Sequence, residues 1–131
     1  MASVFFGIND RTFTHESTAA RAEHVGAGVC YPVDFALTSD DVAYILNRGR
    51  EDRPDGTRLT VIRLSEDGEE YISEFGSYGE ADGQFIWPVG VALDKDTNVY
   101  VTDEWRHRIT KYSQGGEYLS HWGVPALETG S

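Results

Sequence analysis

The chain contains an internal repeat, which constrains its fold more than any other feature because each copy of a repeat folds as one unit. Four pairs of segments align in the same order: residues 31–37 with 87–93, 44–47 with 100–103, 61–65 with 109–113, and 71–76 with 118–123. The offset is 56 residues in the first two pairs, 48 in the third and 47 in the fourth. Segments that keep their order, with gaps only between them, predict two copies of one structural unit.

Within each copy the apolar residues alternate with a period of two, which is typical of β-strands. In the second copy Val91 and Leu93 share one face of a run, and Val99 and Val101 share a face of the next run. Turn-forming residues separate the runs at residues 96–98, 104–107 and 114–116. The pattern predicts a four-stranded antiparallel meander in each copy. Because one such sheet cannot cover both of its faces, it must stack on a neighbour.

The alignment leaves two registers open for the third strand of the first copy. If Val61 lies over Ile109, the first copy carries eight extra residues ahead of that strand. They belong to a charged loop at residues 48–57, which contains a Pro-Asp-Gly turn signal. If Arg58 lies over Arg108 instead, the strand needs a two-residue bulge farther along. Both registers stay open at the level of the sequence.

The second copy resembles the NHL repeat. The matching segments are residues 83–85, 87–94, 98–103, 107–109 and 116–123. That family builds β-propellers, commonly six-bladed, with one four-stranded sheet per blade, so the resemblance implies an all-β fold of antiparallel propeller blades. It covers about residues 26–123 and is looser in the first copy. One position departs from the family pattern, because Arg106 stands where the repeat usually has asparagine.

The resemblance implies a layout of two blades. Residues 1–30 are expected to form a partial preceding blade and a crossing segment, 31–76 blade one, 77–88 a crossing segment, 89–123 blade two, and 124–131 the start of the next crossing. The expected strands are residues 33–37, 42–46, 59–64 and 70–75 in blade one, and 89–93, 98–102, 108–112 and 118–122 in blade two. A propeller needs about four to eight blades, so this chain alone leaves it incomplete. We favour a piece of a longer protein; the alternative is a ring of three two-bladed chains.

Composition excludes several classes of partner. Eleven Lys and Arg stand against 22 Asp and Glu, for a formal net charge of −11, so neither nucleic acid nor an anionic membrane is an expected partner. No apolar run approaches the ~20 residues that span a bilayer, and we expect a soluble protein, cytoplasmic by default. Cys30 is the single cysteine, which excludes an internal disulfide. We assign it no nearby base and expect a buried small hydrophobe.

The sequence predicts no metal and no cofactor. Residues 94–98 carry the first three oxygen ligands of a calcium loop, but Val99 and Trp105 stand where that loop needs glycine and glutamate. A hairpin turn is the better interpretation of this segment. The histidines are too dispersed for a local zinc motif, although distant histidines can converge in a propeller channel. They are His15, His24, His107 and His121.

Three repeat positions are expected to be structural: Asn47, Asp103 and Arg108. Asp103 ends one expected strand and Arg108 begins the next, where a carboxylate and a guanidinium can form a bidentate pair that fixes the connection. Asn47 and Arg58 are the counterparts in the first copy.

Binding residues are expected, by analogy with the family, on a loop face formed by residues 48–57, 76–87 and 104–107. The candidates are Arg48, Arg50, Arg53, Glu104, Trp105, Arg106 and His107. Trp105 is bulkier than a short turn requires, so we expect it to be exposed for a partner. Trp87 and Trp122 are expected to be buried at equivalent blade positions.

The predicted function is a non-catalytic propeller scaffold that recognises a protein, a peptide or a small polar ligand on its loops. Relatives in tripartite-motif proteins bind RNA or proteins, and the acidic charge of this chain counts against RNA. The alternative is part of a metal-dependent, lyase-like or hydrolase-like propeller enzyme. Such a site needs blades that this chain lacks, so no catalytic residue is carried over from the family.

Overall fold

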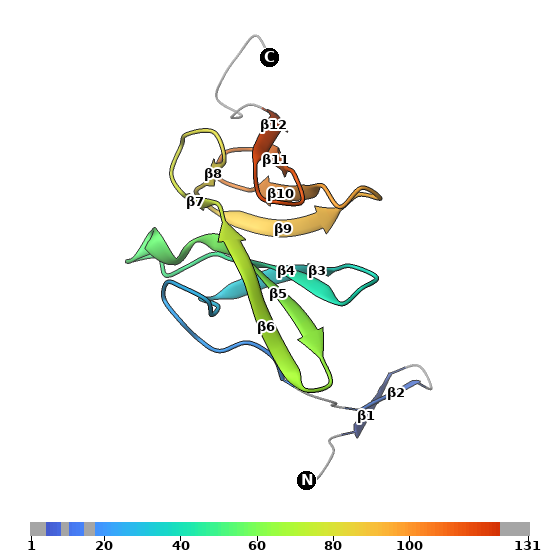
Figure 1. The fold of residues 1–131 in the computed structure, drawn as a ribbon. Coiled ribbons are helices and arrows are strands. Elements are labelled where there is room, and N and C mark those ends of the chain that lie inside the picture. The colour runs from blue at the N-terminus through green and yellow to red at the C-terminus, as the bar shows by residue number, and fades with distance from the viewer. Residues whose placement is uncertain (1–4, 9–10, 15–17, 124–131) are drawn as a thin grey trace.

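The computed structural model describes residues 5–8, 11–14 and 18–123, and its main body is two four-stranded antiparallel sheets stacked on each other (Figure 1). Blade one comprises β3 (Pro32–Leu37), β4 (Val42–Asn47), β5 (Arg58–Ser65) and β6 (Gly68–Phe75). Blade two comprises β9 (Pro88–Leu93), β10 (Val99–Asp103), β11 (Arg108–Tyr112) and β12 (Tyr118–Trp122). Strands adjacent in sequence are adjacent in each sheet, so both are meanders and the all-β prediction is confirmed.

Shorter elements flank the blades. β1 (Phe5–Ile8) and β2 (Arg11–Thr14) form a hairpin that stands apart from the stacked sheets in Figure 1. β7 (Ser77–Tyr78) and β8 (Gln84–Phe85) form a parallel pair in the segment that crosses to blade two, and the 3-10 turn η1 (Pro54–Gly56) lies between β4 and β5. Among the residues described, no helix has the length and apolar character needed to cross a membrane. The predictions for His15 and for residues 124–131 lie outside the described residues.

The hydrophobic core lies between the two blades. β10 shows the expected alternation, with Val99 and Val101 fully buried and Tyr100 and Thr102 turned to the other face. The core cluster comprises Val42, Tyr44, Leu46, Leu59, Val61, Phe85, Val99, Val101 and Tyr112. Each large apolar side chain contributes about 1.5–3 kcal/mol when buried, so the two sheets stabilise each other by covering their facing sides.

The structure decides the register of β5. Asn47 pairs with Arg58 in blade one just as Asp103 pairs with Arg108 in blade two, so Arg58 corresponds to Arg108. Placing Val61 over Ile109 was therefore wrong. β4 pairs with β5 without interruption, and no two-residue bulge is needed. Six extra residues lie in the loop between Asn47 and Arg58, which has ten residues against four between Asp103 and Arg108. Three more lengthen the β5–β6 hairpin, which continues as far as the pairing of Ser65 with Gly68.

The repeat extends upstream of blade one. Ala22 and Val29 form a parallel bridge, and the residues 56 positions later, Tyr78 and Phe85, form the corresponding parallel pair of β7 and β8. The crossing ahead of each blade is therefore also a repeated unit. The assignment of residues 1–30 to a partial preceding blade stays a prediction.

The tryptophans differ in part from expectation. Trp105 is 69% exposed, as predicted. Trp122 is 50% exposed, so its predicted burial is wrong; its ring stacks on Tyr100 with 6.1 Å between centroids, on the face of blade two that points away from blade one. Trp87 lies half-buried in the crossing and is not at an equivalent position, because Trp122 lies on β12.

Candidate functional site

The last residue of the second strand in each blade fixes the crossing that precedes that blade. Asp103 is buried, and its carboxylate accepts three backbone N–H groups at 2.7 to 3.1 Å, two of them from Ile86 and Trp87. Asn47 accepts the N–H of Cys30 at 2.9 Å at the corresponding place in blade one. These side chains satisfy backbone donors in a part-buried segment, where an unpaired N–H is costly.

The predicted bidentate pair of Asp103 with Arg108 is wrong. The carboxylate of Asp103 is taken up by backbone N–H groups, and Nε of Arg108 is buried without a hydrogen-bond partner among the described residues. Arg106 fixes the crossing instead. Its guanidinium donates to the carbonyl oxygens of Glu80 at 2.6 Å, Ala81 at 3.3 Å and Gln84 at 3.2 Å. The residue that departs from the family pattern therefore has a structural contact of its own.

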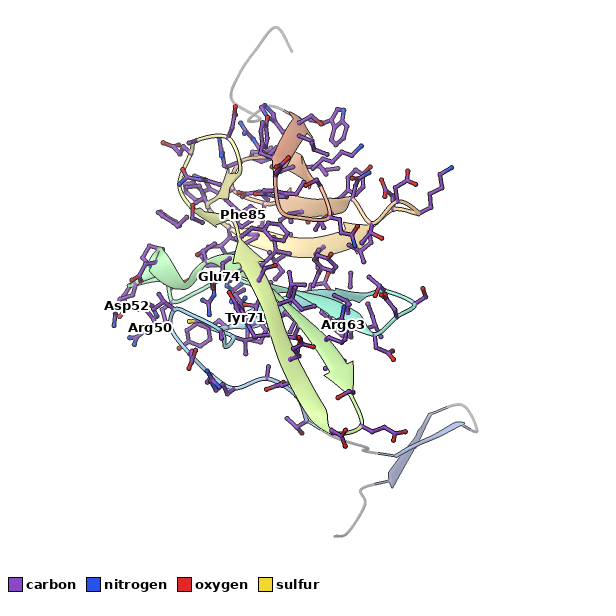
Figure 2. The ribbon with its side chains drawn as sticks, in the orientation of Figure 1. Arg50, Asp52, Arg63, Tyr71, Glu74 and Phe85 are labelled. Carbon is purple, nitrogen blue, oxygen red and sulfur yellow. The ribbon has the colours of Figure 1, made fainter. Side chains whose placement is uncertain are left out.

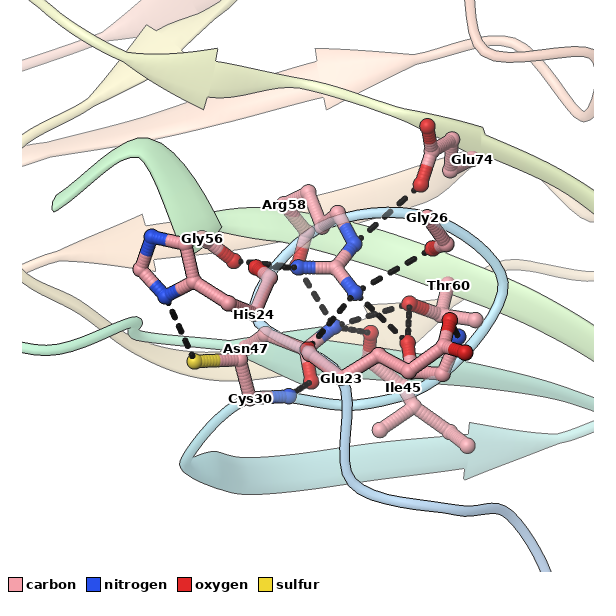
Figure 3. Close-up of polar contacts among 11 residues, drawn as sticks. Glu23, His24, Gly26, Cys30, Ile45, Asn47, Gly56, Arg58, Thr60 and Glu74 are labelled. Carbon is pink, nitrogen blue, oxygen red and sulfur yellow. Dashed lines mark hydrogen bonds and ion pairs between the residues drawn. The ribbon is translucent and has the colours of Figure 1, made fainter.

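Arg58 makes the equivalent contacts in blade one (Figure 3). Its side chain is 5% exposed, and its Nε lies 3.2 Å from the carboxylate of Glu74. Its terminal nitrogens donate to the carbonyl oxygens of His24 at 2.9 Å, Gly26 at 3.2 Å, Gly28 at 2.7 Å and Gly56 at 2.8 Å. The sequence analysis placed Arg58 among the structural positions as the counterpart of Arg108, but it did not predict these contacts with the crossing, which Arg106 makes in blade two.

A groove opens where the long loop of blade one meets the crossing into blade two. It has a volume of about 550 Å³, within the range of about 300–1,000 Å³ that is usual for ligand pockets. Its lining comes from residues 48–51 and 54, residues 78–80, 86 and 87, and Trp105. The structure thus brings together three of the predicted binding residues, Arg48, Arg50 and Trp105.

The groove is lined by cationic and aromatic side chains whose positions are set by their neighbours. The guanidinium of Arg48 lies over the ring of Trp87, 4.6 Å from its centroid, as in a cation–π contact. Arg50 donates to both carboxylate oxygens of Asp52, at 3.0 and 2.8 Å, and Figure 2 shows the two residues at the left edge of the view, beside blade one. The hydrogen bonds from Arg50 hold the pKa of Asp52 below its usual range. The exposed indole of Trp105 completes the lining.

The other loop candidates lie outside the groove lining. Arg53 lies 3.8 Å from the carboxylate of Asp55 and lines a neighbouring cavity. Glu104 and His107 line a separate shallow hollow beside Trp122.

The turn at residues 94–98 is a hairpin turn, as its sequence predicts. Asp94 accepts the backbone N–H groups of Asp96 and Asn98, both at 2.9 Å. A hydrogen bond from the side chain of Asn98, supported by these N–H groups and the Tyr100 hydroxyl, lowers the pKa of Asp94 to about 2. Across the part of the chain that the structure describes, no group of three or more His, Cys, Asp or Glu side chains is placed to hold a metal ion.

The environment of Cys30 corrects the sequence prediction. The residue is part-buried, but it does have a nearby base, because Nδ1 of His24 lies 3.7 Å from its Sγ. The sequence gives no signal for this contact: the two residues are six apart in a segment without regular alternation, and only the folded crossing brings them together.

Comparison with known proteins supports the repeat. The NHL repeat family model matches residues 85–112, which include β9, β10 and the whole of β11. The protein Brain tumor of Drosophila melanogaster is 34% identical over 53 residues, which are 40% of this chain and 5% of that protein. A crystal structure of a Bacteroides fragilis protein matches with a TM-score of 0.59 at 13% identity, over 84% of this chain and 29% of that one, and shows the fold alone. The matches therefore identify an NHL repeat at residues 85–112, in the second of the two stacked four-stranded meanders.

Proposed function

We propose that this chain is a recognition scaffold whose groove between the long loop of blade one and the crossing into blade two binds a segment of a partner protein. The observation that carries the proposal is the exposed indole of Trp105 at a groove in which Arg48 is already stacked on Trp87. Tryptophan, tyrosine and arginine are the residues that most often dominate binding energy at protein interfaces. The groove offers all three, since Tyr78 also lines it.

The chemistry of the lining indicates the kind of segment that it suits. Arg48 and Arg50 can donate to carboxylates or backbone carbonyl oxygens, and Trp105 offers an apolar surface to an aliphatic or aromatic side chain. Glu51 and Glu80 line the same groove, so its charge is mixed. With a net charge of −11 on the whole chain, a uniformly anionic polymer is a poor ligand. A peptide that combines one acidic group with apolar side chains fits these features best.

A selection from a random peptide library displayed on phage tests the proposal. Peptides selected on the 131-residue chain should lose at least tenfold in affinity for the Trp105→Ala variant, because truncating an anchor residue of this kind costs about 2 kcal/mol or more. Leu119→Ala is the matched control, since Leu119 is an exposed apolar residue on β12 that does not line the groove. Titration calorimetry of each selected peptide against the three chains gives the affinities. If the peptides bind the Trp105→Ala variant as tightly as the control, the groove is not the recognition site.

A further inference from the structure

A cysteine, a histidine and an aspartate from separate parts of the chain meet beside the long loop of blade one. Sγ of Cys30 lies 3.7 Å from Nδ1 of His24, and Nε2 of the same ring is hydrogen-bonded to the carboxylate of Asp55 (Figure 3 shows the Cys30–His24 contact). Cys30 and His24 belong to the crossing ahead of blade one, and Asp55 belongs to the turn η1. The two nitrogens of one imidazole therefore face a thiol and a carboxylate.

Buried side chains of blade one hold the backbone of this cluster in place. Asn47, at the end of β4, accepts the N–H of Cys30 at 2.9 Å, and Arg58, at the start of β5, donates to the carbonyl oxygen of His24 at 2.9 Å. Both side chains are almost fully buried. Reactive groups keep a productive geometry only when supporting residues fix them in this way.

The state of the imidazole follows from its partners. The hydrogen bond from His24 lowers the pKa of Asp55, which favours the carboxylate form. A carboxylate can only accept, so Nε2 of His24 carries the proton that it donates to Asp55. With the proton on Nε2, the lone pair of the base form of the ring is on Nδ1, which faces Cys30. A nucleophile, a base and a group that orients the base are the three parts of an activated nucleophile.

A small reactant has access to the sulfur. Cys30 and His24 line a cavity of about 500 Å³, together with Tyr31, Arg50 and Arg53. The side chain of His24 is 22% exposed and Cys30 is only part-buried. The thiol therefore lies at a cavity wall.

We propose that Cys30, His24 and Asp55 form a nucleophilic thiol site that reacts with small, soft electrophiles. Nδ1 of His24 accepts the thiol proton as Sγ attacks, and the carboxylate of Asp55 stabilises the imidazolium that results. With iodoacetamide the S–C bond forms as the C–I bond breaks, iodide leaves, and the imidazolium later returns its proton to water. With hydrogen peroxide the S–O bond forms as the O–O bond breaks, and the leaving hydroxide takes the proton from His24 to give water and a sulfenic acid.

The rate of alkylation by iodoacetamide at neutral pH tests the site. The reference is the same chain unfolded in urea, in which the thiol neither contacts His24 nor is shielded by the residues around it. The folded chain should react faster than the unfolded chain, and His24→Gln should lower the folded rate at least tenfold, since a positioned base contributes about 10²–10⁴. His121→Gln is the matched control, because His121 is hydrogen-bonded to Tyr118 and does not line the Cys30 cavity. Cys30→Ser should remove labelling altogether.

Further variants separate base catalysis from a structural effect. Added imidazole should restore part of the rate to His24→Ala, which a purely structural histidine would not show. Asp55→Asn should lower the rate less than His24→Gln does, whereas Asp67→Asn, in the exposed turn between β5 and β6 and away from the Cys30 cavity, should leave it unchanged. Asp55 is exposed, so we expect the Asp55→Asn variant to fold. It therefore tests the site even if the histidine variants do not fold. The proposal fails if folded Cys30 reacts more slowly than the unfolded thiol, or if the Asp55→Asn and Asp67→Asn variants react alike.

Discussion

Arg58 and Arg106 have the same structural role in the two blades, although they occupy different positions of the repeat. Each guanidinium donates to carbonyl oxygens of the crossing ahead of its blade, although Arg58 aligns with Arg108 and not with Arg106. A long side chain with five donors can reach one set of acceptors from more than one backbone position. An alignment compares backbone positions and does not show how far a side chain extends. The sequence therefore predicted Arg108, and not Arg106, as the structural arginine of blade two.

Replacing Arg58 by methionine should cost about 3 kcal/mol in the free energy of unfolding. The carbonyl oxygens of His24, Gly26 and Gly56 would lose the donor that Arg58 supplies in a part-buried place, and Gly28 would keep only the Thr60 hydroxyl. Each unsatisfied group costs about 1–3 kcal/mol. Arg63→Met is the control in the same strand, because Arg63 is exposed and should change stability by no more than about 0.5 kcal/mol. Urea denaturation followed by circular dichroism compares them. Equal losses in the two variants would contradict the role of Arg58.

Asp94 should stay ionised to unusually low pH in the folded chain. The hydrogen bond from the side chain of Asn98 is the main cause of a pKa of about 2, against 3.8 in an unstructured chain. Because the folded-state pKa is lowered, the stabilisation from the carboxylate is complete above about pH 3.8 and is lost as the pH falls through 2. The carboxyl ¹³C shift of Asp94 should show a midpoint near pH 2, and Asn98→Ala should raise it. A midpoint near 3.8 in the unaltered chain would refute the contact.

At the scale of elements, the sequence predicted the bounds of the strands better than the register in which they pair. The bounds of all eight blade strands agree with the prediction to within two residues. The register of β5 could not be chosen, because the two alternatives differ by an even number of residues. Side chains alternate with period two along a strand, so such a shift leaves the same residues on the same face. Only the observed pairing of Asn47 with Arg58 separates the alternatives.

The bulges and loops show which parts of the blade are repeated. β5–β6 and β11–β12 each carry a register shift at the corresponding place, between Val61 and Ile62 and between Lys111 and Tyr112. Bulges re-aim a strand and are kept as features of a fold. The loop at residues 48–57 is longer than its counterpart, and it supplies lining to both the groove and the Cys30 cavity. The sequence predicted this loop as a binding segment from its length and charge, but its contacts with the crossing depend on tertiary packing.

At the scale of the whole molecule, burial depends on what covers each sheet. Val99 and Val101 are buried because blade one covers their face, whereas Trp122 and Ile109 are exposed on the other face of blade two. Alternation predicts which residues share a face but not which face is covered. The prediction that Trp122 is buried failed for this reason. The exposure of Trp105 could be predicted because it follows from the position of this residue in a turn and not from which face of the sheet is covered.

The two sheets of this chain pack face to face around one core, and the groove depends on this packing. Methyl NOE spectra of the 131-residue chain, with Leu and Val methyls labelled, test it most directly. We expect NOEs between the blades, joining the methyls of Leu46 and Val61 to those of Val99, Val101 and their neighbours in the same core cluster. If NOEs connect methyls only within each sheet, the blades do not stack as described. The groove between the long loop of blade one and the crossing into blade two would then have no structural basis.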